Sequence, residues 1–345
     1  MFNKVVISET NLISNVKQVK KNNPNSLICA MVKANAYGVG QKQVVQILNE
    51  YVDYFGVACF FEAKNIKRLT NKKILIVGAL EKGVIDKCFS YTCHCLEDVE
   101  YLIKKDIKLN IHLKVNTGMN RFGFKNIKDF NLALQKIKHS KLNLEGVFTH
   151  FATSDGYVEV QYNKFKKFLY VLKKQNLKAI IHADNSVVEE TRNHNLNMVR
   201  IGFNLYNLNN EKYSSVVEIK SKIVQINYVQ KNELVGYNKN FIADRRLKVA
   251  IIPIGYADGF DLRYIGFNLI INSKPCKVLN ICMDCFMLDV SSLKIKKGDS
   301  VYILNKQNSL KRYSLYSKLS EYQVMTNFSK IRAVKLVSPS NCENK

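Results

Sequence analysis

Short apolar runs alternate with longer segments of helical periodicity between residues 26 and 201. The runs are rich in Ile, Val, Leu and Phe, which is typical of strands buried on both faces of a parallel sheet. Most are followed by a segment with apolar residues every three to four positions, which predicts amphipathic helices. The eight runs are residues 26–32, 54–58, 73–79, 91–95, 109–115, 144–150, 179–183 and 198–201.

A strand followed by a helix, repeated eight times within about 180 residues, predicts a (β/α)8 barrel, and an open doubly wound sheet is the alternative. After Leu205 the pattern changes to β-type alternation, and no long helical pattern returns before Arg312 to Phe328. We therefore expect an α/β fold with a barrel followed by a mostly β C-terminal domain. The expected boundaries are 1–8 for a strand that joins the C-terminal domain, 9–210 for the barrel and 211–345 for the C-terminal domain.

The composition limits the class of protein. The chain has 345 residues, of which 47% are hydrophobic, enough for two cores. A net charge of +25 would favour nucleic acid or a membrane as a partner, but the lysines are spread over every predicted helix. The chain shows neither an export signal nor an apolar stretch long enough to span a bilayer. We expect a cytoplasmic protein with no nucleic-acid and no membrane partner.

The nine cysteines are odd in number and scattered, which favours reduced thiols over a disulfide framework. The nearest approach to metal-ligand spacing is in residues 93–95 and 282–285. A structural zinc site normally needs two knuckles with a suitable gap, and these two segments do not provide them. No metal site is expected.

Chemically unusual side chains follow several predicted strands, at the end where barrel enzymes place their active sites. Lys33 follows an apolar run that should be buried, and a desolvated lysine has a free amine that can condense with an aldehyde. In a lysine-rich chain, an ordinary surface lysine at a strand end is the alternative. The unusual residues are Lys33, Lys114, Arg121, His150, Asn185, Ser186 and Arg200.

Seven segments carry a distinctive motif pattern, namely Met31–Gly38, Leu113–Gly123, Thr149–Ala152, Asn185–Ser186, Met198–Arg200, Pro253–Gly259 and Cys282–Asp284. In their order and at similar spacing, these segments resemble the motifs of the alanine racemase family. The resemblance covers nearly the whole chain and implies a barrel with bound pyridoxal 5'-phosphate (PLP) and a second, mostly β domain.

The resemblance implies that Lys33 holds PLP as a Schiff base and serves as the base for D-alanine. It implies that Tyr237 acts on the opposite face, for L-alanine, because racemisation needs proton exchange on both sides of a planar carbon. His150 and Arg200 are implied to support the phenolate, and Arg200 is implied to face the pyridine nitrogen. Because guanidinium keeps its proton, this arrangement weakens the cofactor as an electron sink.

The resemblance also assigns the remaining site residues. Lys114 matches a lysine that is often carbamylated in the family. Because the C-terminal domain is implied to complete the active site of another subunit, a head-to-tail homodimer is expected. Cofactor contacts are implied for Tyr37, Asn185, Ser186, Gly202, Phe203 and Tyr322, and substrate contacts for Arg121, Tyr256, Met283 and Asp284.

The chain departs from the family pattern at Val39, Asn116, Ile201 and Asn327. The expected reaction is interconversion of L-alanine and D-alanine, which would supply D-alanine for peptidoglycan. The alternatives are a broad-specificity or serine racemase of the same fold, a related decarboxylase, and a non-catalytic PLP-binding carrier protein. A carrier would end after the barrel, whereas this chain continues for about 140 residues that include Tyr237.

Overall fold

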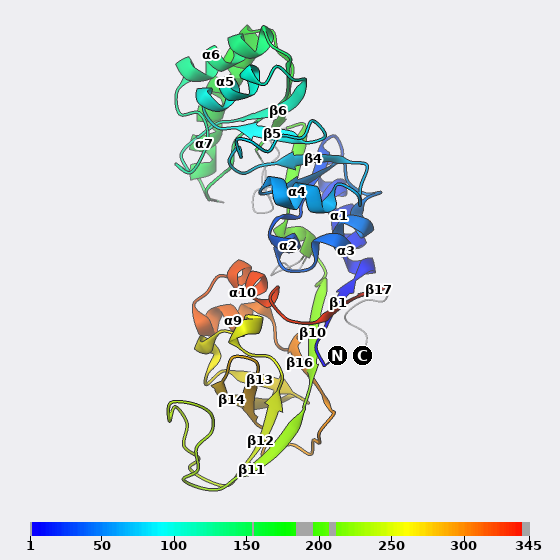
Figure 1. Cartoon of the computed structure of the whole chain (residues 1–345), viewed down its shortest axis with the longest axis vertical. Coiled ribbons are helices and arrows are strands. Elements are labelled where there is room, and N and C mark those ends of the chain that lie inside the picture. Colours follow the sequence, from blue (N-terminus) through cyan, green and yellow to red (C-terminus); the bar gives the residue numbers. More distant parts are fainter. Residues whose placement is uncertain (1, 154, 184–195, 207–211, 340–345) are drawn as a thin grey trace. The chain divides into compact units, whose positions relative to one another are not determined.

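The computed structural model describes residues 2–153, 155–183, 196–206 and 212–339. The chain divides into two compact units, which are coloured along the sequence in Figure 1. The barrel unit consists of Val16–Ala36 and Val44–Leu205. The C-terminal unit consists of Met1–Asn15, Tyr37–Gln43 and Tyr206–Lys345.

The barrel unit is built on one sheet of eight parallel strands in the order β8-β7-β6-β5-β4-β3-β2-β9. Asn197 links the two ends of this sheet: its N–H donates to the carbonyl of Ile181 (2.9 Å), and its Oδ1 accepts from the N–H of Ile181 (3.0 Å). The nearly closed barrel confirms the predicted fold class and excludes the open doubly wound sheet. The strands are β2 (Leu27–Met31), β3 (Tyr54–Val57), β4 (Lys73–Ile76), β5 (Ser90–Cys93), β6 (Leu109–Lys114), β7 (Leu142–Phe148), β8 (Ile180–His182) and β9 (Met198–Ile201).

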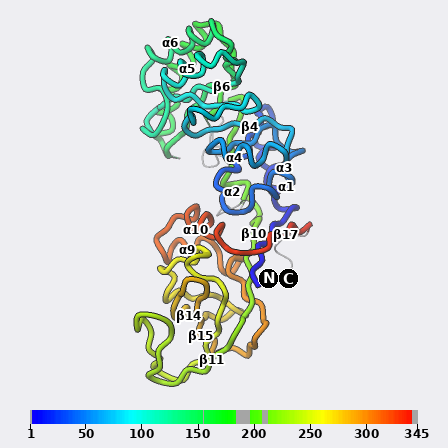
Figure 2. Tube along the Cα trace, in the orientation of Figure 1, coloured from blue at the N-terminus to red at the C-terminus, as the bar shows by residue number. Residues whose placement is uncertain are grey.

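The helices of the barrel unit lie outside this sheet, as Figures 1 and 2 show for α5, α6 and α7. In α6, Phe130, Ala133, Leu134 and Ile137 are buried at helical spacing, and Asn126 caps the first turn. This amphipathic pattern explains why the segment forms a helix against the sheet. The helices are α1 (Glu9–Asn22), which begins in the C-terminal unit, α3 (Gln41–Leu48), α4 (Phe60–Ile66), α5 (Leu96–Lys104), α6 (Ile127–Lys138), α7 (Tyr157–Lys174) and α8 (Phe203–Tyr206).

The C-terminal unit contains two sheets, ordered β16-β10-β1-β17 and β11-β12-β15-β14-β13. In the first, β1 pairs antiparallel with β10 and parallel with β17, although β1 opens the chain. The described elements are β1 (Lys4–Ser8), β10 (Val217–Lys222), β11 (Gln225–Val229), β12 (Leu247–Ile252), β13 (Asn268–Ile271), β14 (Lys274–Ile281), β15 (Phe286–Asp289), β16 (Ser300–Leu304), β17 (Val334–Ser338), the short turns Tyr256–Asp258 and Leu262–Tyr264, and the helices α9 (Leu310–Ser317) and α10 (Glu321–Phe328).

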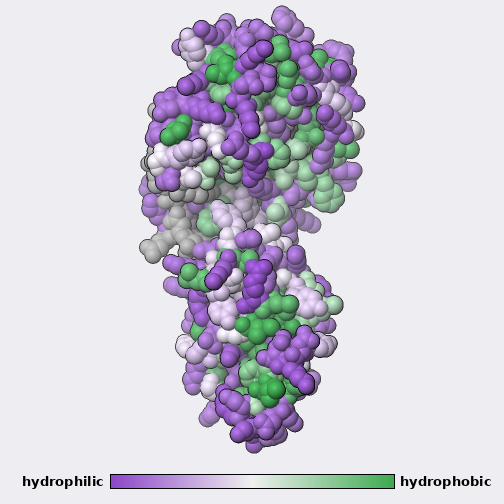
Figure 3. All heavy atoms as spheres, turned by 90° about the vertical axis from the view of Figure 1, so that its left-hand side faces the viewer, coloured by the Kyte–Doolittle hydropathy of each residue, from purple (hydrophilic) through white to green (hydrophobic). Residues whose placement is uncertain are grey.

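Hydrophilic side chains are spread over the face drawn in Figure 3 and do not gather in one patch. This distribution agrees with lysines placed on many helices. Among the described residues, no helix is both long and apolar enough to cross a membrane. The eight cysteines at described positions are free thiols.

Gly146 in β7 lies where the barrel core has no room for a Cβ atom. A Cβ built there would lie 2.1 Å from Nδ1 of the buried His112. We predict that Gly146→Ala lowers the free energy of unfolding by about 1–3 kcal/mol, because the ring must move in a close-packed core. Gly156→Ala is the control, since nothing lies within 4 Å of its built Cβ. Denaturant titration of both variants checks this, and equal stabilities would contradict it.

Candidate active site

Lys33 lies where β2 leaves the barrel sheet. Val32 before it is buried and donates its N–H to the carbonyl of Gly56 in β3 (2.8 Å). The segment α2 (Lys33–Tyr37) is a left-handed turn, because φ lies between 51° and 56° at residues 34–37. Each non-glycine residue in this region costs about 1–2 kcal/mol, so the surrounding structure must hold the turn.

Glu62 at the start of α4 holds the beginning of this turn. Its Oε1 accepts from the N–H of Ala34 (2.7 Å), and its Oε2 accepts from the N–H of Ala58 (2.8 Å). These are charge-assisted hydrogen bonds, which are stronger than neutral ones. Glu62 therefore joins the residue after Lys33 to the end of β3.

Four basic side chains influence one another at this end of the barrel: Lys33, Lys114, Arg121 and Arg200. Burial, Arg121 and Arg200 lower the pKa of Lys33, and Glu62 opposes this effect. Burial and the same two arginines, with Lys33, lower the pKa of Lys114 to about 7. Burial and all four cations lower the pKa of His150 to about 3, so its ring is neutral. Both amines are therefore easier to deprotonate than ordinary lysines.

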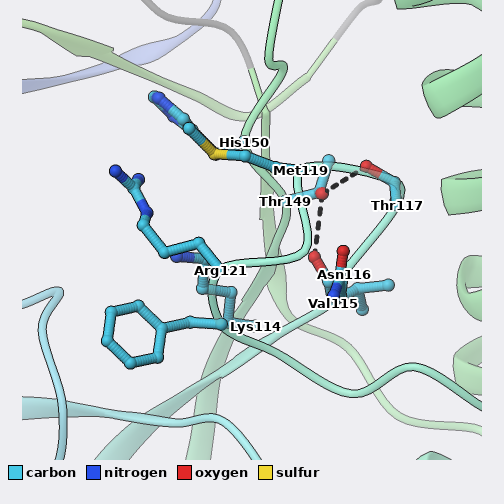
Figure 4. Close-up of a pocket in the computed structure, with 9 residues that line it drawn as sticks. Lys114, Val115, Asn116, Thr117, Met119, Arg121, Thr149 and His150 are labelled. Atoms are coloured by element: carbon cyan, nitrogen blue, oxygen red, sulfur yellow. Dashed lines mark hydrogen bonds between the residues drawn. The ribbon is translucent and has the colours of Figure 1, made fainter.

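Lys114 contributes to a small pocket formed by the loop after β6 and the end of β7 (Figure 4). Its Nζ lies 5.3 Å from the centre of the Phe122 ring and 5.7 Å from that of Phe148. No carboxylate of a described residue forms an ion pair with it. The pocket is lined by Lys114, Val115, Asn116, Thr117, Met119, Arg121, Phe122, Thr149 and His150.

Asn116 organises the loop that presents Arg121. Its Oδ1 accepts from the N–H groups of Gly118 and Asn120 (both 3.1 Å). Two backbone hydrogen bonds close the loop. Asn116 N–H donates to the carbonyl of Phe124 (2.9 Å), and Phe124 N–H donates to the carbonyl of Lys114 (2.8 Å). An asparagine can form this turn as an aspartate can, so the departure from the family pattern removes a charge and leaves the loop intact.

Arg200 is held from three sides at the end of β9. Its Nη1 lies 2.6 Å from Nδ1 of His182, and its Nη2 donates to the carbonyls of Thr149 (2.8 Å) and Ala183 (3.1 Å). The same Nη2 lies 3.5 Å from Nδ1 of His150. These contacts fix the plane of the guanidinium.

The C-terminal unit carries the second set of candidate residues, among which Tyr237 is 68% exposed. Asn280 at the end of β14 donates to the carbonyls of Val235 (3.0 Å) and Tyr237 (3.1 Å). Gly236 has φ +76° and packs against the Asn280 side chain, where a built Cβ would lie 2.5 Å from it. The backbone of Tyr237 is thus anchored while its phenol faces outward.

Tyr256 and Met283 lie on adjacent loops. Tyr256 N–H donates to the carbonyl of Cys282 (3.0 Å), and Ala257 N–H donates to that of Met283 (2.9 Å). Below them, the buried Asp258 accepts from the guanidinium of Arg332 (2.8 and 2.9 Å). Tyr256 and Met283 are exposed, and so is Asp284.

Two candidate phosphate ligands, Tyr37 and Tyr322, lie close together in the C-terminal unit, with ring centres 6.1 Å apart. Burial raises the pKa of Tyr322 to about 12, so it remains a hydrogen-bond donor near neutral pH. Gly202 and Phe203 lie where β9 leads into α8. Asn185 and Ser186 lie outside the described residues.

Sequence reasoning missed Glu62, Asn280, His182, His112 and Glu145. For the last three a signal existed, since each lies within an apolar strand, and charged or imidazole side chains are seldom fully buried without partners. For Glu62 and Asn280 no local signal existed, because their partners come from other segments.

Comparison with known proteins identifies the family. Residues 7–210 match the sequence model of the alanine racemase N-terminal domain, and residues 216–336 match that of the C-terminal domain. An alanine racemase of Fusobacterium nucleatum is 34% identical over 325 residues, covering 87% of this chain and 90% of that protein. The alanine racemase of Clostridium difficile 630 superposes with a TM-score of 0.91 at 27% identity, covering 99% of this chain and 97% of that one.

A crystal structure of alanine racemase from Bacillus anthracis with bound L-Ala-P also matches, with a TM-score of 0.91 at 26% identity, covering 98% of this chain and 96% of that one. The resemblance expected from the motifs is confirmed over both domains. The chain therefore belongs to the alanine racemase family of PLP-dependent racemases.

Proposed function

We propose that the chain interconverts L-alanine and D-alanine with Lys33 and Tyr237 as the two acid/base groups, and that the D-alanine serves peptidoglycan synthesis. The observation that carries this proposal is the half-buried amine of Lys33, which lies near the cations Arg121 and Arg200. Its partial burial and these two cations lower its pKa. A lysine with a lowered pKa can condense with an aldehyde and can exchange a proton near neutral pH.

The described residues suit PLP. Lys33 provides an amine, the cation cluster attracts anionic groups, and Tyr37 and Tyr322 provide phenol donors. When bound, PLP delocalises the electron pair left on the amino-acid Cα. Arg200 would face the pyridine nitrogen of the bound cofactor and would keep its own proton, because guanidinium is not deprotonated in proteins. Asn185, Ser186, Gly202 and Phe203 complete the proposed cofactor site.

The substrate is held so that both faces of Cα are accessible to a proton donor. Arg121 binds the alanine carboxylate together with the backbone of Met283 from a second copy of the chain, while Tyr256 and Asp284 of that copy border the site. Lys33 exchanges the proton on one face and Tyr237 on the other. A phenol is a poor base unless its neighbours stabilise the phenolate, and we assign that role to the neutral ring of His150 together with the guanidinium of Arg200.

We further propose that Tyr237 acts in the active site of a second subunit, in a head-to-tail homodimer. Tyr237, Tyr256 and Met283 are all strongly exposed in the C-terminal unit, with fractions of 68%, 44% and 59%. Large side chains anchored through their backbones but exposed at their tips are suited to contact another molecule.

Tyr237→Phe tests the two-base assignment. We expect this variant to lose about a hundred- to ten-thousand-fold in racemisation rate, because it lacks a general acid/base. Exchange of the α-hydrogen of L-alanine with deuterium from solvent should be lost, whereas exchange from D-alanine should remain. Tyr228→Phe is the matched control, since Tyr228 is a similarly exposed tyrosine of the same unit. Normal racemisation by Tyr237→Phe would refute the assignment of Tyr237.

A heterodimer of one Lys33→Ala subunit and one Tyr237→Phe subunit tests the shared site. If the sites are shared, one site receives both changes and the other receives neither, so the isolated heterodimer should regain about half of the normal activity. If each subunit used its own Tyr237, both sites would be damaged. Activity no higher than that of the parent variants would therefore exclude the shared site.

Lys114 is proposed to carry a carbamate. Its neutral amine would attack CO2, form an N–C bond and release one proton, and the negative product would pair with Arg121. Because the pKa of Lys114 is lowered to about 7, the reactive free amine is abundant above that pH and lost below it.

We predict a carbamate signal in 13C spectra of protein equilibrated with labelled bicarbonate at pH 8, with loss of the signal at pH 6. The Lys114→Met variant should lack the signal, and Lys128→Met, which changes an exposed lysine of α6, should retain it. A spectrum without any signal from Lys114 at pH 8 would show that this lysine is unmodified.

A further inference from the structure

A line of buried polar side chains runs from Arg200 into the core of the barrel unit. His182 contacts Arg200 through Nδ1 (2.6 Å), and its Nε2 lies 2.9 Å from Nδ1 of His112. Nε2 of His112 lies 3.2 Å from Oε2 of Glu145. Both rings are fully buried, and Glu145 is 7% exposed. Among these residues only Arg200 has a role in the proposed reaction.

All hydrogen bonds along this line are donated in the direction from Arg200 to Glu145, because a guanidinium can only donate hydrogen bonds. Nδ1 of His182 must therefore accept, which places its proton on Nε2. That proton is donated to Nδ1 of His112, and the proton of His112 on Nε2 is donated to Glu145. A second proton on either ring would place two donors face to face. The geometry thus requires two neutral imidazoles of the same tautomer.

Glu145 ends the line as an anion. Burial raises its pKa, but hydrogen bonds from His112, Lys73 (2.5 Å) and Ser90 (2.5 Å) outweigh this and lower the pKa to about 2. Burial also lowers the pKa of His112 and of His182, and Arg200 lowers both further. The lowered values agree with the neutral rings that the hydrogen-bond directions require.

The other groups facing this line do not compete with Glu145 as acceptors. Lys73 is a donor whose side chain is 57% exposed, and its Nζ also lies over the ring of Tyr54. Burial and the neighbouring Glu145 raise the pKa of Tyr54, so it stays a phenol. Among these described neighbours, the carboxylate of Glu145 is thus the acceptor for the Nε2–H of His112.

We propose that Glu145 is a positioning residue for the racemase, which orients Arg200 through His112 and His182. Its carboxylate accepts the proton of His112, fixes both tautomers, and so directs a lone pair of His182 toward the guanidinium. This inference rests on the proposed role of Arg200. Without the carboxylate, the Nε2–H of His112 would be buried and unpaired. The proton of His112 can then move to Nδ1, which removes this unpaired donor. His182 would then present a proton to Arg200 and displace it.

Two variants of Glu145 distinguish the effect of losing its hydrogen-bond acceptor from the effect of losing its negative charge. Glu145→Met removes the acceptor, whereas Glu145→Gln keeps an oxygen for His112 and removes the charge. Glu100→Gln is the control, since Glu100 is a partly exposed residue of α5 paired with Lys136. Side-chain 15N spectra of histidine-labelled protein, recorded without and with PLP, report the tautomers directly. Racemisation kinetics report the position of Arg200.

In the unchanged protein we expect neutral Nε2–H signals for His112 and His182 that do not titrate between pH 5 and 9. Glu145→Met should lose this pattern, and kcat should fall about ten- to a hundredfold with little change in KM for alanine, because Arg121 binds the carboxylate separately. Glu145→Gln should keep the pattern and stay within about threefold of the normal kcat. A merely structural role would change the melting temperature without changing the tautomers.

An Nδ1–H or charged ring at either position in the unchanged protein would overturn the inference, even if Glu145→Met fails to fold. Normal tautomers and kcat in Glu145→Met would do the same. If the unchanged protein does not racemise alanine, the proposed function fails, and the nitrogen spectra alone decide whether Glu145 sets the tautomers.

Discussion

The chemistry of the site depends on the crowding of four basic side chains at one end of the barrel. Lys33, Lys114, Arg121 and Arg200 are close enough to shift one another's protonation. Two of them are arginines that keep their protons, so the lysines and His150 lose theirs more readily. The same crowding attracts anions, which is what a phosphate and a carboxylate require of their site. Burial lowers the pKa of both lysines most, and the crowding adds to this effect while also favouring anions.

Two carboxylates, Glu62 and Glu145, lie near this cluster, and their positions matter. A carboxylate paired directly with Lys33 would hold it as an ammonium ion. Glu62 instead bonds to two backbone N–H groups beside Lys33, and Glu145 reaches Arg200 only through two imidazoles. Both carboxylates therefore balance the cations in part without neutralising them. Glu62 also stabilises the left-handed turn, whose cost the barrel must offset.

The sequence predicted the barrel because fully buried strands read as continuous apolar runs, and each of the eight runs contains an observed strand or most of one. It placed the four basic motif residues at strand ends or in the loops that follow, where barrel active sites are built, but it did not show how they shift one another's pKa. It could not predict that Glu62 caps the turn after Lys33, or that Asn280 anchors Tyr237, because these contacts join distant segments. For Glu145 the sequence offered one indication, which is a charged residue inside an apolar run that should be buried.

The asparagine at position 116 is the departure that bears most directly on the cluster. Its side-chain oxygen keeps the turn through Gly118 and Asn120, so an aspartate is not needed for the shape of the loop. What the loop lacks is a negative charge beside Lys114 and Arg121. Burial lowers the pKa of Lys114 most, and the neighbouring Arg121 and Arg200 lower it further. A carbamate on the neutral amine would restore negative charge at the place where the loop does not supply it.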